Sequence, residues 1–376
     1  MNPYDFVRID WKWPPERRAP IWHHRLFGVS GACLYSGYLD VEIYVETPLF
    51  IATHTASSDP QMPDSCMQNA RGEYIIPGSS LKGMLRSLVE TLGNGCLALF
   101  DGDYERRKVD YNREVPAAFQ RCTHNTDLCI ACRIFGMLGV RGGIFQGKVN
   151  IGDAVIYPSK TYLHEPVYIN PLMEPRPHHA SFYLDESHRY IAGRKYYFHH
   201  SPASLLHLET KDAQNAHQRI GRRAKRYIQP FGCETAFRFR IDFTSLERDE
   251  FAALLFAVAL EENMRHKLGY GKPLGLGTVA LLPVSMTLID YSVRYSRSGT
   301  NKGKTVIDGN DLWQFIYKQS DLFSDTTLAN IAMEDLRRIW QWLPATDVAY
   351  YYPSKRDWFD KPESVGKRIA DTKNVP

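Results

Sequence analysis

The chain has 376 residues, of which 44% are hydrophobic, so it can hold two domains or one domain with large insertions, and it can bury a core. Lys and Arg total 46 against 42 Asp and Glu, and the net charge of +4 excludes a polycation that binds nucleic acid through bulk charge alone. The first twenty residues carry prolines and charges where a signal peptide needs an apolar core, and no long apolar run predicts a membrane span. We therefore expect a cytoplasmic protein without membrane contact, in which any nucleic acid is bound by local clusters of cations.

Alternating hydrophobicity predicts a half-buried strand over residues 39–46. A polar loop over residues 52–72 follows, and loops of this length inside a compact domain are usually functional or disordered. Residues 74–76 predict a short strand that runs into Ser79 and Ser80, either of which can cap the next helix. That helix has one apolar stripe, formed by Leu81, Met84, Leu85, Leu88, Val89 and Leu92.

The second half of the chain repeats the order of strand, helix and strand. We predict a strand over residues 146–156, another over 235–243, a helix over 250–264, and a glycine-rich loop that leads into a strand over 269–282. Residues 305–376 look mainly helical. The fold class is therefore predicted as α+β, with a βαββαβ ferredoxin-like (RRM-like) core that carries insertions.

A Cys/His cluster lies in an irregular segment over residues 96–145. Its spacing is Cys122-x-His124-x4-Cys129-x2-Cys132, and three thiolates with one imidazole satisfy a tetrahedral Zn²⁺. Four protein ligands leave no open position, so the predicted zinc is structural. The alternative is a redox CxxC or unrelated free cysteines, which leaves Cys122 and His124 unexplained.

Four glycines punctuate the loop before the last predicted strand, at Gly269, Gly271, Gly275 and Gly277, with Lys272 among them. Closely spaced glycines let backbone N–H groups approach phosphates, and the lysine adds positive charge. No Gly-Lys-Ser/Thr opens a helix here, so this is not a Walker loop. The alternative is a tight turn that needs positive φ angles.

Two basic stretches lie in the segment over residues 159–232. One interleaves Arg194 and Lys195 with aromatic side chains, and the other places Arg222 and Arg223 among five cations within eight residues. Interleaved rings and cations fit single-stranded RNA, because bases stack on the rings while the cations follow the phosphates. The alternative for the second stretch is a solvated helix face.

The long polar loop holds two carboxylates, Asp59 and Asp64, with His54 nearby. A carboxylate in such a loop can hold Mg²⁺ at a scissile phosphate. The alternative is a pair of ordinary turn formers, since Asp-Pro is a turn dipeptide.

Three of these strings together resemble the CRISPR-associated RAMP superfamily. Residues 76–86 resemble its IPGSSLKGxLR signature, residues 129–136 its CxxCxLFG, and residues 269–277 its C-terminal glycine-rich loop, all in the order of the family. The resemblance covers about residues 30–290.

The resemblance implies an RNA-binding backbone subunit of a type III CRISPR effector complex. Such a subunit binds the CRISPR guide RNA (crRNA), which pairs with a complementary target RNA, and it contacts other RAMP subunits and a large subunit. The implied RNA contacts are the helix start and its first turns, the loop glycines and the cations named above, namely Ser79, Ser80, Lys82, Arg86, Arg194, Lys195, Arg222, Arg223, Gly269, Gly271, Lys272, Gly275 and Gly277.

The resemblance also implies a division of the chain. Residues 1–304 form the RAMP core, with a zinc-binding insertion at about 96–145 and a thumb-like insertion at about 159–232 that wedges between RNA bases. Residues 305–376 form a mainly helical C-terminal extension outside the common core.

In many family members an Asp in the loop after the first strand cleaves target RNA with a divalent metal. The resemblance therefore implies a metal-dependent endoribonuclease with Mg²⁺ at Asp59 or Asp64, of which Asp59 is the better placed. The glycine-rich run that surrounds this Asp in the family is absent here. Two alternatives stay open, namely a processing endoribonuclease that cuts precursor crRNA through acid–base groups such as His54, and a non-catalytic capping subunit.

Overall fold

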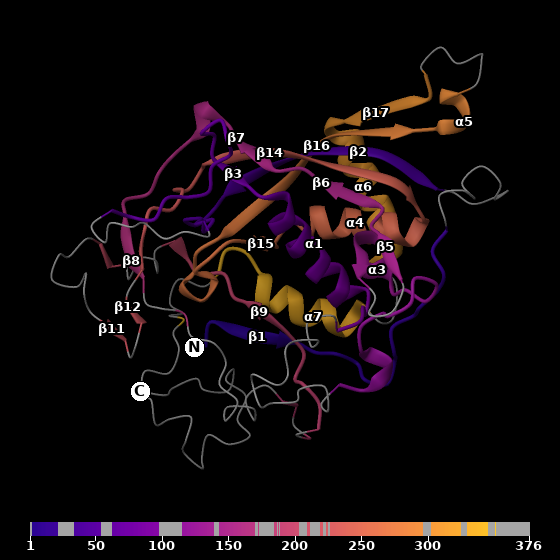
Figure 1. The fold of residues 1–376 in the computed structure, drawn as a ribbon, viewed down its shortest axis with the longest axis horizontal. Helices are drawn as coiled ribbons and strands as arrows, with labels where there is room; N and C mark the ends of the chain where they lie inside the picture. The colour runs from indigo at the N-terminus through magenta and orange to yellow at the C-terminus, as the bar shows by residue number, and fades with distance from the viewer. Residues whose placement is uncertain are drawn as a thin grey trace.

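The protein is a mixed α and β structure in which most elements share one hydrophobic core (Figure 1). This confirms the predicted α+β class. A computed structural model provides the coordinates. The residues that it describes are 2–21, 34–53, 62–97, 115–138, 143–169, 172, 184–185, 187, 189–202, 209–210, 219–220, 223–224, 226–295, 302–324, 329–344 and 350.

The largest layer is an antiparallel sheet. Its central order is β16 (Thr278–Ile289), β2 (Tyr35–Val45), β14 (Ala236–Leu246), and then β6 (Val149–Ile151) together with β7 (Ala154–Ile156). Each neighbouring pair is antiparallel. If β6 and β7 are counted as one position, the chain visits β2 first, β6 and β7 second, β14 third and β16 fourth. Across the sheet the order is therefore 4-1-3-2. Shorter strands extend the sheet, namely β15 (His266–Lys267) and β17 (Lys304–Asp308) beside β16, and β3 (Ile75–Ile76) beside β7.

One face of this sheet is apolar because side chains alternate along each strand. On β2 the apolar residues Leu39, Val41 and Ile43 are at most 1% exposed. Helices α1 (Gly78–Leu92) and α4 (Arg248–Ala259) lie against that face (Figure 1). Helix α1 connects β2 to β6, and α4 connects β14 to β16, so the predicted order of elements is present.

Helix α1 begins one residue before the predicted caps. Pro77 occupies the N-cap position without a side-chain hydrogen bond, so the predicted capping by Ser79 or Ser80 is wrong. Both serines lie exposed in the first turn, and the carboxylate of Asp153 instead accepts the N–H of Gly78 at 2.8 Å. The predicted stripe is buried at Leu81, Leu85, Leu88, Val89 and Leu92, and half-buried at Met84.

The single strand predicted over residues 146–156 is three short strands. β5 (Ile144–Gln146) pairs with β4 (Gly136–Leu138), whereas β6 and β7 pair with β14. The pairing of β5 with β4 ends at Gly147. A side chain at this position would collide with the backbone of Phe135, so the turn requires glycine. The chain breaks again at Asp153, whose side chain is committed to the start of α1.

The helix predicted over residues 250–264 ends at Ala259. Leu260 has a φ of +55°, which turns the chain away from the helix axis. Met264 is still buried, but it reaches the core from this turn, where it pairs with Gln341. The apolar periodicity therefore located the core residues correctly and overran the helix.

A buried ion cluster joins three elements below the sheet. Glu250 is 0% exposed and accepts hydrogen bonds from Arg133 at 2.8 Å and from Lys148 at 2.7 Å. Arg133 lies on α3 (Ile130–Phe135), and Lys148 directly precedes β6. The same carboxylate accepts the backbone N–H of Glu247, which closes a capping box on α4. One side chain thus sets the positions of α3 and β6 relative to α4.

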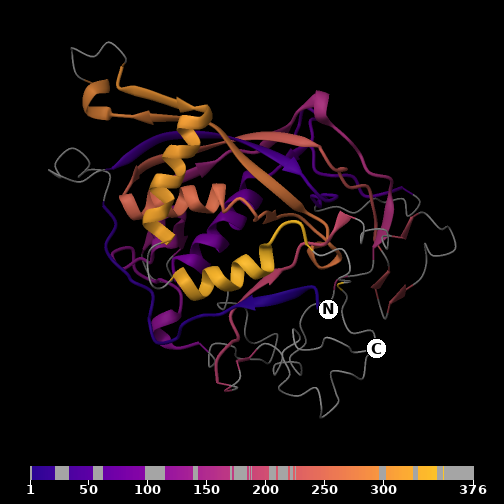
Figure 2. The same cartoon turned by 180° about the vertical axis from the view of Figure 1, so that it is seen from behind.

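A second layer lies below the helices (Figures 1 and 2). Strand β1 (Tyr4–Val7) pairs with β9 (Arg194–Tyr197), and helix α7 (Ala329–Trp340) packs on both. Arg8 binds Asp335 at 2.8 Å, which ties the N-terminal strand to α7. Segments from both ends of the sequence therefore build this layer.

Two helices in the predicted extension over residues 305–376 are packed into the core. Helix α6 (Gly309–Ser324) lies against α4, and Leu312, Ile316 and Leu336 are 0% exposed in the same hydrophobic cluster. Strand β17 joins the main sheet just before it. The boundary after residue 304 stays a prediction.

The segment over residues 159–232 forms small sheets on one flank (Figure 1). Its thumb-like role stays a prediction. The strands are β8 (Val167–Ile169) between β10 (Glu209–Thr210) and β13 (Arg226–Ile228), and the pair β11 (Arg219–Ile220) and β12 (Arg223–Ala224). The remaining short elements are 3₁₀ turns at Ala117–Phe119, Pro158–Lys160 and Lys272–Leu274, and helix α5 at Tyr291–Arg294.

The Glu250→Ala variant tests the buried ion cluster. We expect it to lower the free energy of unfolding by about 3–5 kcal/mol, because it removes the fully buried carboxylate that two buried cations share and leaves them only the more exposed Asp249 and Glu247. The control is Glu261→Ala, which removes a partly exposed pair with Arg337 and costs about 0–1 kcal/mol. Equal denaturation midpoints for the two variants would contradict the role given to Glu250.

Candidate functional site

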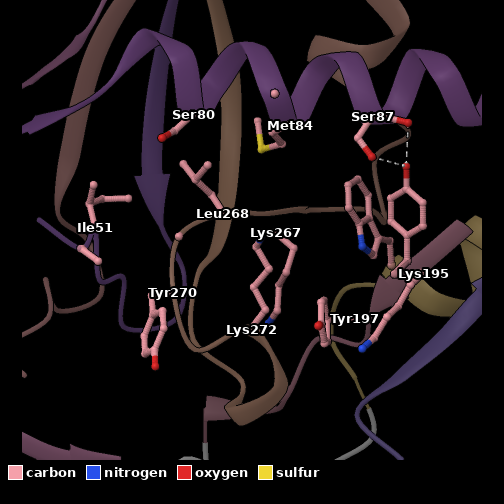
Figure 3. Close-up of a pocket in the computed structure, with 15 residues that line it drawn as sticks. Ile51, Ser80, Met84, Ser87, Lys195, Tyr197, Lys267, Leu268, Tyr270 and Lys272 are labelled. Atoms are coloured by element: carbon pink, nitrogen blue, oxygen red, sulfur yellow. Dashed lines mark hydrogen bonds between the residues drawn. The ribbon is translucent and has the colours of Figure 1, made fainter. Parts of the chain in front are cut away.

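A cavity of about 490 Å³ lies between the exposed side of α1, the glycine-rich loop and the second layer (Figure 3). Its volume falls in the range of sites that hold small ligands or parts of larger ones. The residues that line it are Ile51, Ala52, Ser80, Gly83, Met84, Ser87, Lys195, Tyr196, Tyr197, Lys267, Leu268, Gly269, Tyr270, Lys272 and Trp340.

Helix α1 forms the roof of this cavity with small or flexible side chains (Figure 3). Ser80, Gly83, Met84 and Ser87 follow one another at helical spacing on the side opposite the buried stripe. Two hydroxyl groups and a glycine leave room next to the helix. This explains why Met84, which matches the apolar period, is only half-buried.

The glycine-rich loop forms a second wall. Gly269, Gly271, Gly275 and Gly277 all have φ angles between +78° and +91°, which favour glycine. A Cβ on Gly277 would lie 1.8 Å from the carbonyl oxygen of Leu268, so no other residue fits there. The tight-turn interpretation is therefore correct for the backbone, and the turn also places Gly269 and Lys272 on the cavity.

Three lysines reach the cavity, and no carboxylate is among the residues that line it in the described part of the chain (Figure 3). Desolvation lowers the pKa of Lys195 to about 8 and that of Lys272 below its usual value. Desolvation, followed by repulsion from Lys272, lowers the pKa of the buried Lys267 well below its usual value. Lys267 donates only to the uncharged oxygens of Gly275 and Thr278, at 3.1 and 3.0 Å. An anion in the cavity would favour the charged form of all three lysines.

Strand β9 supplies the third wall. The ammonium of Lys195 lies 3.8 Å from the ring centroid of Tyr4 on β1, a cation–π contact that orders the lysine. The hydroxyl of Tyr196 is hydrogen-bonded to Thr91 at 2.7 Å and donates to the carbonyl of Ser87, so β9 is fixed to α1. The ring of Tyr196 meets Trp340 edge-on, which anchors α7 to the same wall.

The cavity brings together part of the predicted RNA contacts. Ser80, Lys195, Gly269 and Lys272 line it, whereas Ser79 lies exposed beside it. Arg222 and the side chain of Arg223 lie outside the described residues. The sequence analysis missed Lys267, Tyr197, Tyr270, Ser87 and Trp340. Two of these are adjacent to predicted residues, but no sequence pattern indicates that Trp340 joins them across the fold.

Three predicted contacts are occupied within the protein. Arg86 binds Glu90 at 2.8 Å and the carbonyl of Gly136 at 2.8 Å. Arg194 donates to carbonyl groups after α1, and Lys82 donates to the carbonyl of Val149 at 3.3 Å. These side chains stabilise the fold around the cavity and do not line it.

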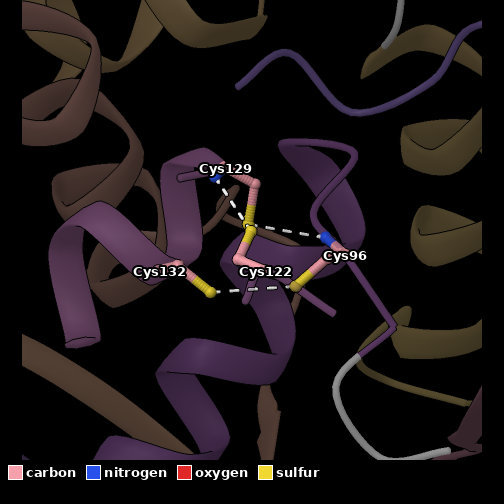
Figure 4. Close-up of side chains that lie close together, drawn as sticks. All are labelled: Cys96, Cys122, Cys129 and Cys132. Carbon is pink, nitrogen blue, oxygen red and sulfur yellow. Dashed lines mark hydrogen bonds between the residues drawn. The ribbon is translucent and has the colours of Figure 1, made fainter. Parts of the chain in front are cut away.

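Four buried cysteines form a separate cluster behind α1 (Figure 4). The sulfur atoms of Cys96, Cys122, Cys129 and Cys132 all lie within 4.8 Å of one another. Those of Cys96 and Cys132 are 3.7 Å apart, too far for a disulfide and close to the edge of about 3.8 Å that Zn–S bonds of about 2.3 Å give a tetrahedron. The donor set therefore fits a structural zinc ion.

The cluster corrects the predicted ligand set. His124 is exposed and is not part of the group, and Cys96 takes the fourth position. The spacing argument looked for four ligands in one short stretch, whereas Cys96 comes from the turn that ends α1. Helix α3, which begins at Ile130, packs on α1 and brings the CxxC pair to that turn. The glycines before Cys96 are the sequence feature that indicates such a turn.

Hydrogen bonds to sulfur link the four cysteines and favour the thiolate at Cys129. The backbone N–H of Cys129 donates to Cys122 at 3.3 Å, and that of Cys96 donates to Cys129 at 3.5 Å. The guanidinium of Arg86 donates to Cys132 at 3.5 Å. Hydrogen bonds from Cys122 and the other neighbouring thiols hold the pKa of Cys129 well below its usual value, whereas hydrogen bonds with Cys122 and Cys129 raise the pKa of Cys96 and that of Cys132. Zinc is bound by thiolates, so these donors suit a metal centre.

The cluster and the cavity are connected through two arginines. Glu90 pairs with Arg86 at 2.8 Å and with Arg194 at 3.4 Å. Arg194 also donates to the carbonyl of Gly95 at 2.8 Å and to that of Cys96 at 3.0 Å. The next residue along β9 is Lys195, which lines the cavity. The conformation of the cysteine turn therefore fixes the strand that carries a cavity lysine.

Of the two predicted catalytic carboxylates, Asp64 does not line the cavity. Asp64 is 6% exposed and binds Arg226 at 2.6 Å, and its backbone bonds to Tyr227 and Gln229 in and after β13. A carboxylate held in this way is a structural link between the loop and β13. Asp59 lies outside the described residues.

Comparison with protein families identifies a match. A model of the RAMP superfamily matches residues 42–280, which is more than half of the chain. No curated protein matches it. Among the described residues, no helix has the length and apolar character to span a bilayer.

The Cys96→Ser variant tests the corrected ligand set. The wild-type protein is expected to hold about one zinc ion per chain, and Cys96→Ser to bind it much more weakly because an alcohol is a poor ligand for this metal. The control is His124→Ala, which should keep its zinc. Metal analysis after dialysis against a chelator measures the zinc content of both variants. Loss of zinc in His124→Ala with retention in Cys96→Ser would show that His124, and not Cys96, is the fourth ligand.

Proposed function

The chain belongs to the RAMP superfamily, and on this premise we propose that it is a crRNA-binding backbone subunit of a type III CRISPR RNA-guided effector complex. Family membership suggests a CRISPR-associated, RNA-binding role. One observation supports the site of binding, namely a cavity that three lysines enter and no described carboxylate lines.

The chemistry of the cavity suits RNA. The cavity offers Lys195, Lys267 and Lys272 no negatively charged partner among its described lining residues, and the phosphates of RNA would supply one. Ser80 and Ser87 offer hydroxyl groups to phosphates or to a ribose 2′-OH, which proteins use to recognise RNA. From the resemblance to RAMP proteins we expect the guide backbone at the start of α1 and at the glycine-rich loop, and both of these elements form walls of the cavity.

We further propose that the central sheet is a ferredoxin-like RAMP core. The four strand positions follow the order fourth, first, third and second, and the two crossover helices lie on one face of the sheet. This arrangement supports the βαββαβ reading of the sequence. Residues 96–145 and 159–232 are proposed as its zinc-binding and thumb-like insertions, and residues 305–376 as its extension.

A zinc ion held by the four cysteines would act structurally. It would supply a rigid connection between the end of α1 and α3, since all four ligands come from the protein and none of its positions would be left for substrate. Arg86 and Arg194 would connect that rigid point to the RNA-binding wall.

Target-RNA cleavage is proposed only through Asp59, since Asp64 is committed to Arg226. Mg²⁺ would be needed if Asp59 acts. The processing endoribonuclease and the non-catalytic cap stay as alternatives. The other RAMP subunits, the large subunit and a cytoplasmic location are likewise proposals that follow from the family.

The Lys272→Ala variant tests the cavity. We expect about a tenfold loss of affinity for single-stranded RNA, because one charged contact to a phosphate is removed. The slope of the logarithm of the binding constant against the logarithm of the salt concentration should also become shallower by about one. Lys318→Ala removes one exposed cation from α6 and is the matched control. Fluorescence anisotropy at several salt concentrations measures both, and equal affinities would overturn the proposed site.

Asp59→Ala and Asp64→Asn test the nuclease in the assembled complex with its guide. If the protein cleaves target RNA, Asp59→Ala should abolish a regularly placed, Mg²⁺-dependent cut. Asp64→Asn should keep that cut but lower the melting temperature, because it weakens the pair with Arg226. An unchanged cutting pattern with Asp59→Ala and guide still bound would leave a non-catalytic subunit.

A further inference from the structure

A hairpin outside the matched residues 42–280 protrudes from the body (Figures 1 and 2). It consists of the outer end of β16, the short helix α5 and β17, which pairs with β16 from Ile289↔Lys304 to Ser285↔Asp308. The hairpin lies away from β9 and α7, which carry Lys195 and Trp340 of the cavity (Figure 1). Its surface is therefore not explained by the proposed site.

The described part of the hairpin tip has a fixed conformation. The carboxylate of Asp290 caps α5 by accepting the N–H groups of Ser292 at 2.9 Å and Val293 at 3.3 Å. The backbone N–H of Asp290 donates to the carbonyl of Gly303 at 2.8 Å. Gly303 has a φ of +66°, and a Cβ there would lie 2.4 Å from the carbonyl oxygen of Asp290. The two sides of the tip are thus held together before any partner binds.

The tip exposes a ring and three cations. Tyr295 is 74% exposed and stacks on Tyr291, with ring planes 10° apart and centroids at 6.1 Å. Arg294, Lys302 and Lys304 are exposed, and none of them forms an ion pair within the described residues. The one carboxylate of the tip, that of Asp290, is engaged in capping and bears a lowered pKa because Ser292 donates to it. The surface is therefore cationic with an open aromatic face.

Two other exposed features lack this combination. On the outer face of the main sheet the guanidinium of Arg240 covers Tyr38 at 4.1 Å and also binds Asp40 at 2.9 Å, so ring, cation and anion satisfy one another. Leu138 and Ile144, at the end of the β4–β5 hairpin, are exposed and opposite each other but carry no charge. The β16–β17 tip joins a ring that is 74% exposed to three exposed cations.

We propose that this tip is a second contact for single-stranded RNA, in which a base stacks on Tyr295 while Arg294, Lys302 and Lys304 bind phosphates. Stacking platforms flanked by cations are the usual means of binding single strands without regard to sequence. The inference rests on the proposed RNA-binding function and adds a site to it. The tip binds nucleotides that lie outside the cavity, so its effect depends on RNA length.

Two RNAs separate the two sites. One has about four nucleotides, the lower end of a single-strand site, and the other is several times longer. Tyr295→Ala should weaken binding of the long RNA about tenfold and leave the short RNA unchanged, since stacking is lost only outside the cavity. The double variant Lys302→Ala/Lys304→Ala should do the same and lower the salt slope by about two. Tyr295→Phe keeps the ring and should bind like the wild type.

The controls make failure of each proposal distinguishable. Lys318→Ala, away from the tip, should bind both RNAs normally. If the tip variants bind the long RNA like wild type while Lys272→Ala does not, the tip makes no RNA contact and the cavity stands. If Lys272→Ala also has no effect on either RNA, the proposed RNA site itself fails. Because all substituted tip side chains are exposed, melting temperatures should match the wild type, and a lowered value would assign the loss to folding and overturn the inference.

Discussion

The buried carboxylate of Glu250 is the constraint on which the rest of the arrangement depends. It holds Arg133 of α3 and Lys148 before β6 against α4. Burying three charges is costly unless each finds a partner with good geometry, and this requirement leaves few alternatives for how the three elements pack. Since α3 and its N-cap residue supply two of the four clustered cysteines, the ion cluster also sets where a metal could bind, and through Arg86 and Glu90 it reaches the helix that roofs the cavity.

The cavity has the opposite electrostatic character. Lys195, Lys267 and Lys272 lie close together without a carboxylate among the described lining residues, and desolvation lowers the pKa of each lysine. The fold maintains this arrangement with contacts elsewhere, such as the Tyr4 ring beneath Lys195 and the carbonyl acceptors of Lys267. Such a site is preorganised for an anion, since the electrostatic cost of gathering the cations is met during folding.

The sequence predicted those features that depend on local pattern. Alternation located β2 and β14, the apolar stripe located the buried side of α1, and the glycine spacing located a turn whose φ angles admit only glycine without strain. It failed where tertiary contacts decide. Arg86 and Arg194 were predicted to contact RNA, but they are bound to Glu90 and to backbone carbonyl groups. His124 was predicted to be a metal ligand, but the turn after α1 brings Cys96 to the cluster instead. Trp340 joins the cavity from a segment far along the chain, which no local pattern indicates.

The second layer has a consequence for the order of events in the cell. Its members are β1 near the start of the chain, β9 near the middle, and α7 close to residue 340. Chains emerge from the ribosome N-terminal end first, at about 5–20 residues per second, so the wall formed by Tyr196 and Trp340 is completed only after the chain has been made beyond residue 340. The roof and the glycine-rich loop emerge earlier, but the cavity is not closed until α7 has also emerged. A ligand that needs all of these walls therefore binds only after α7 has been made and packed.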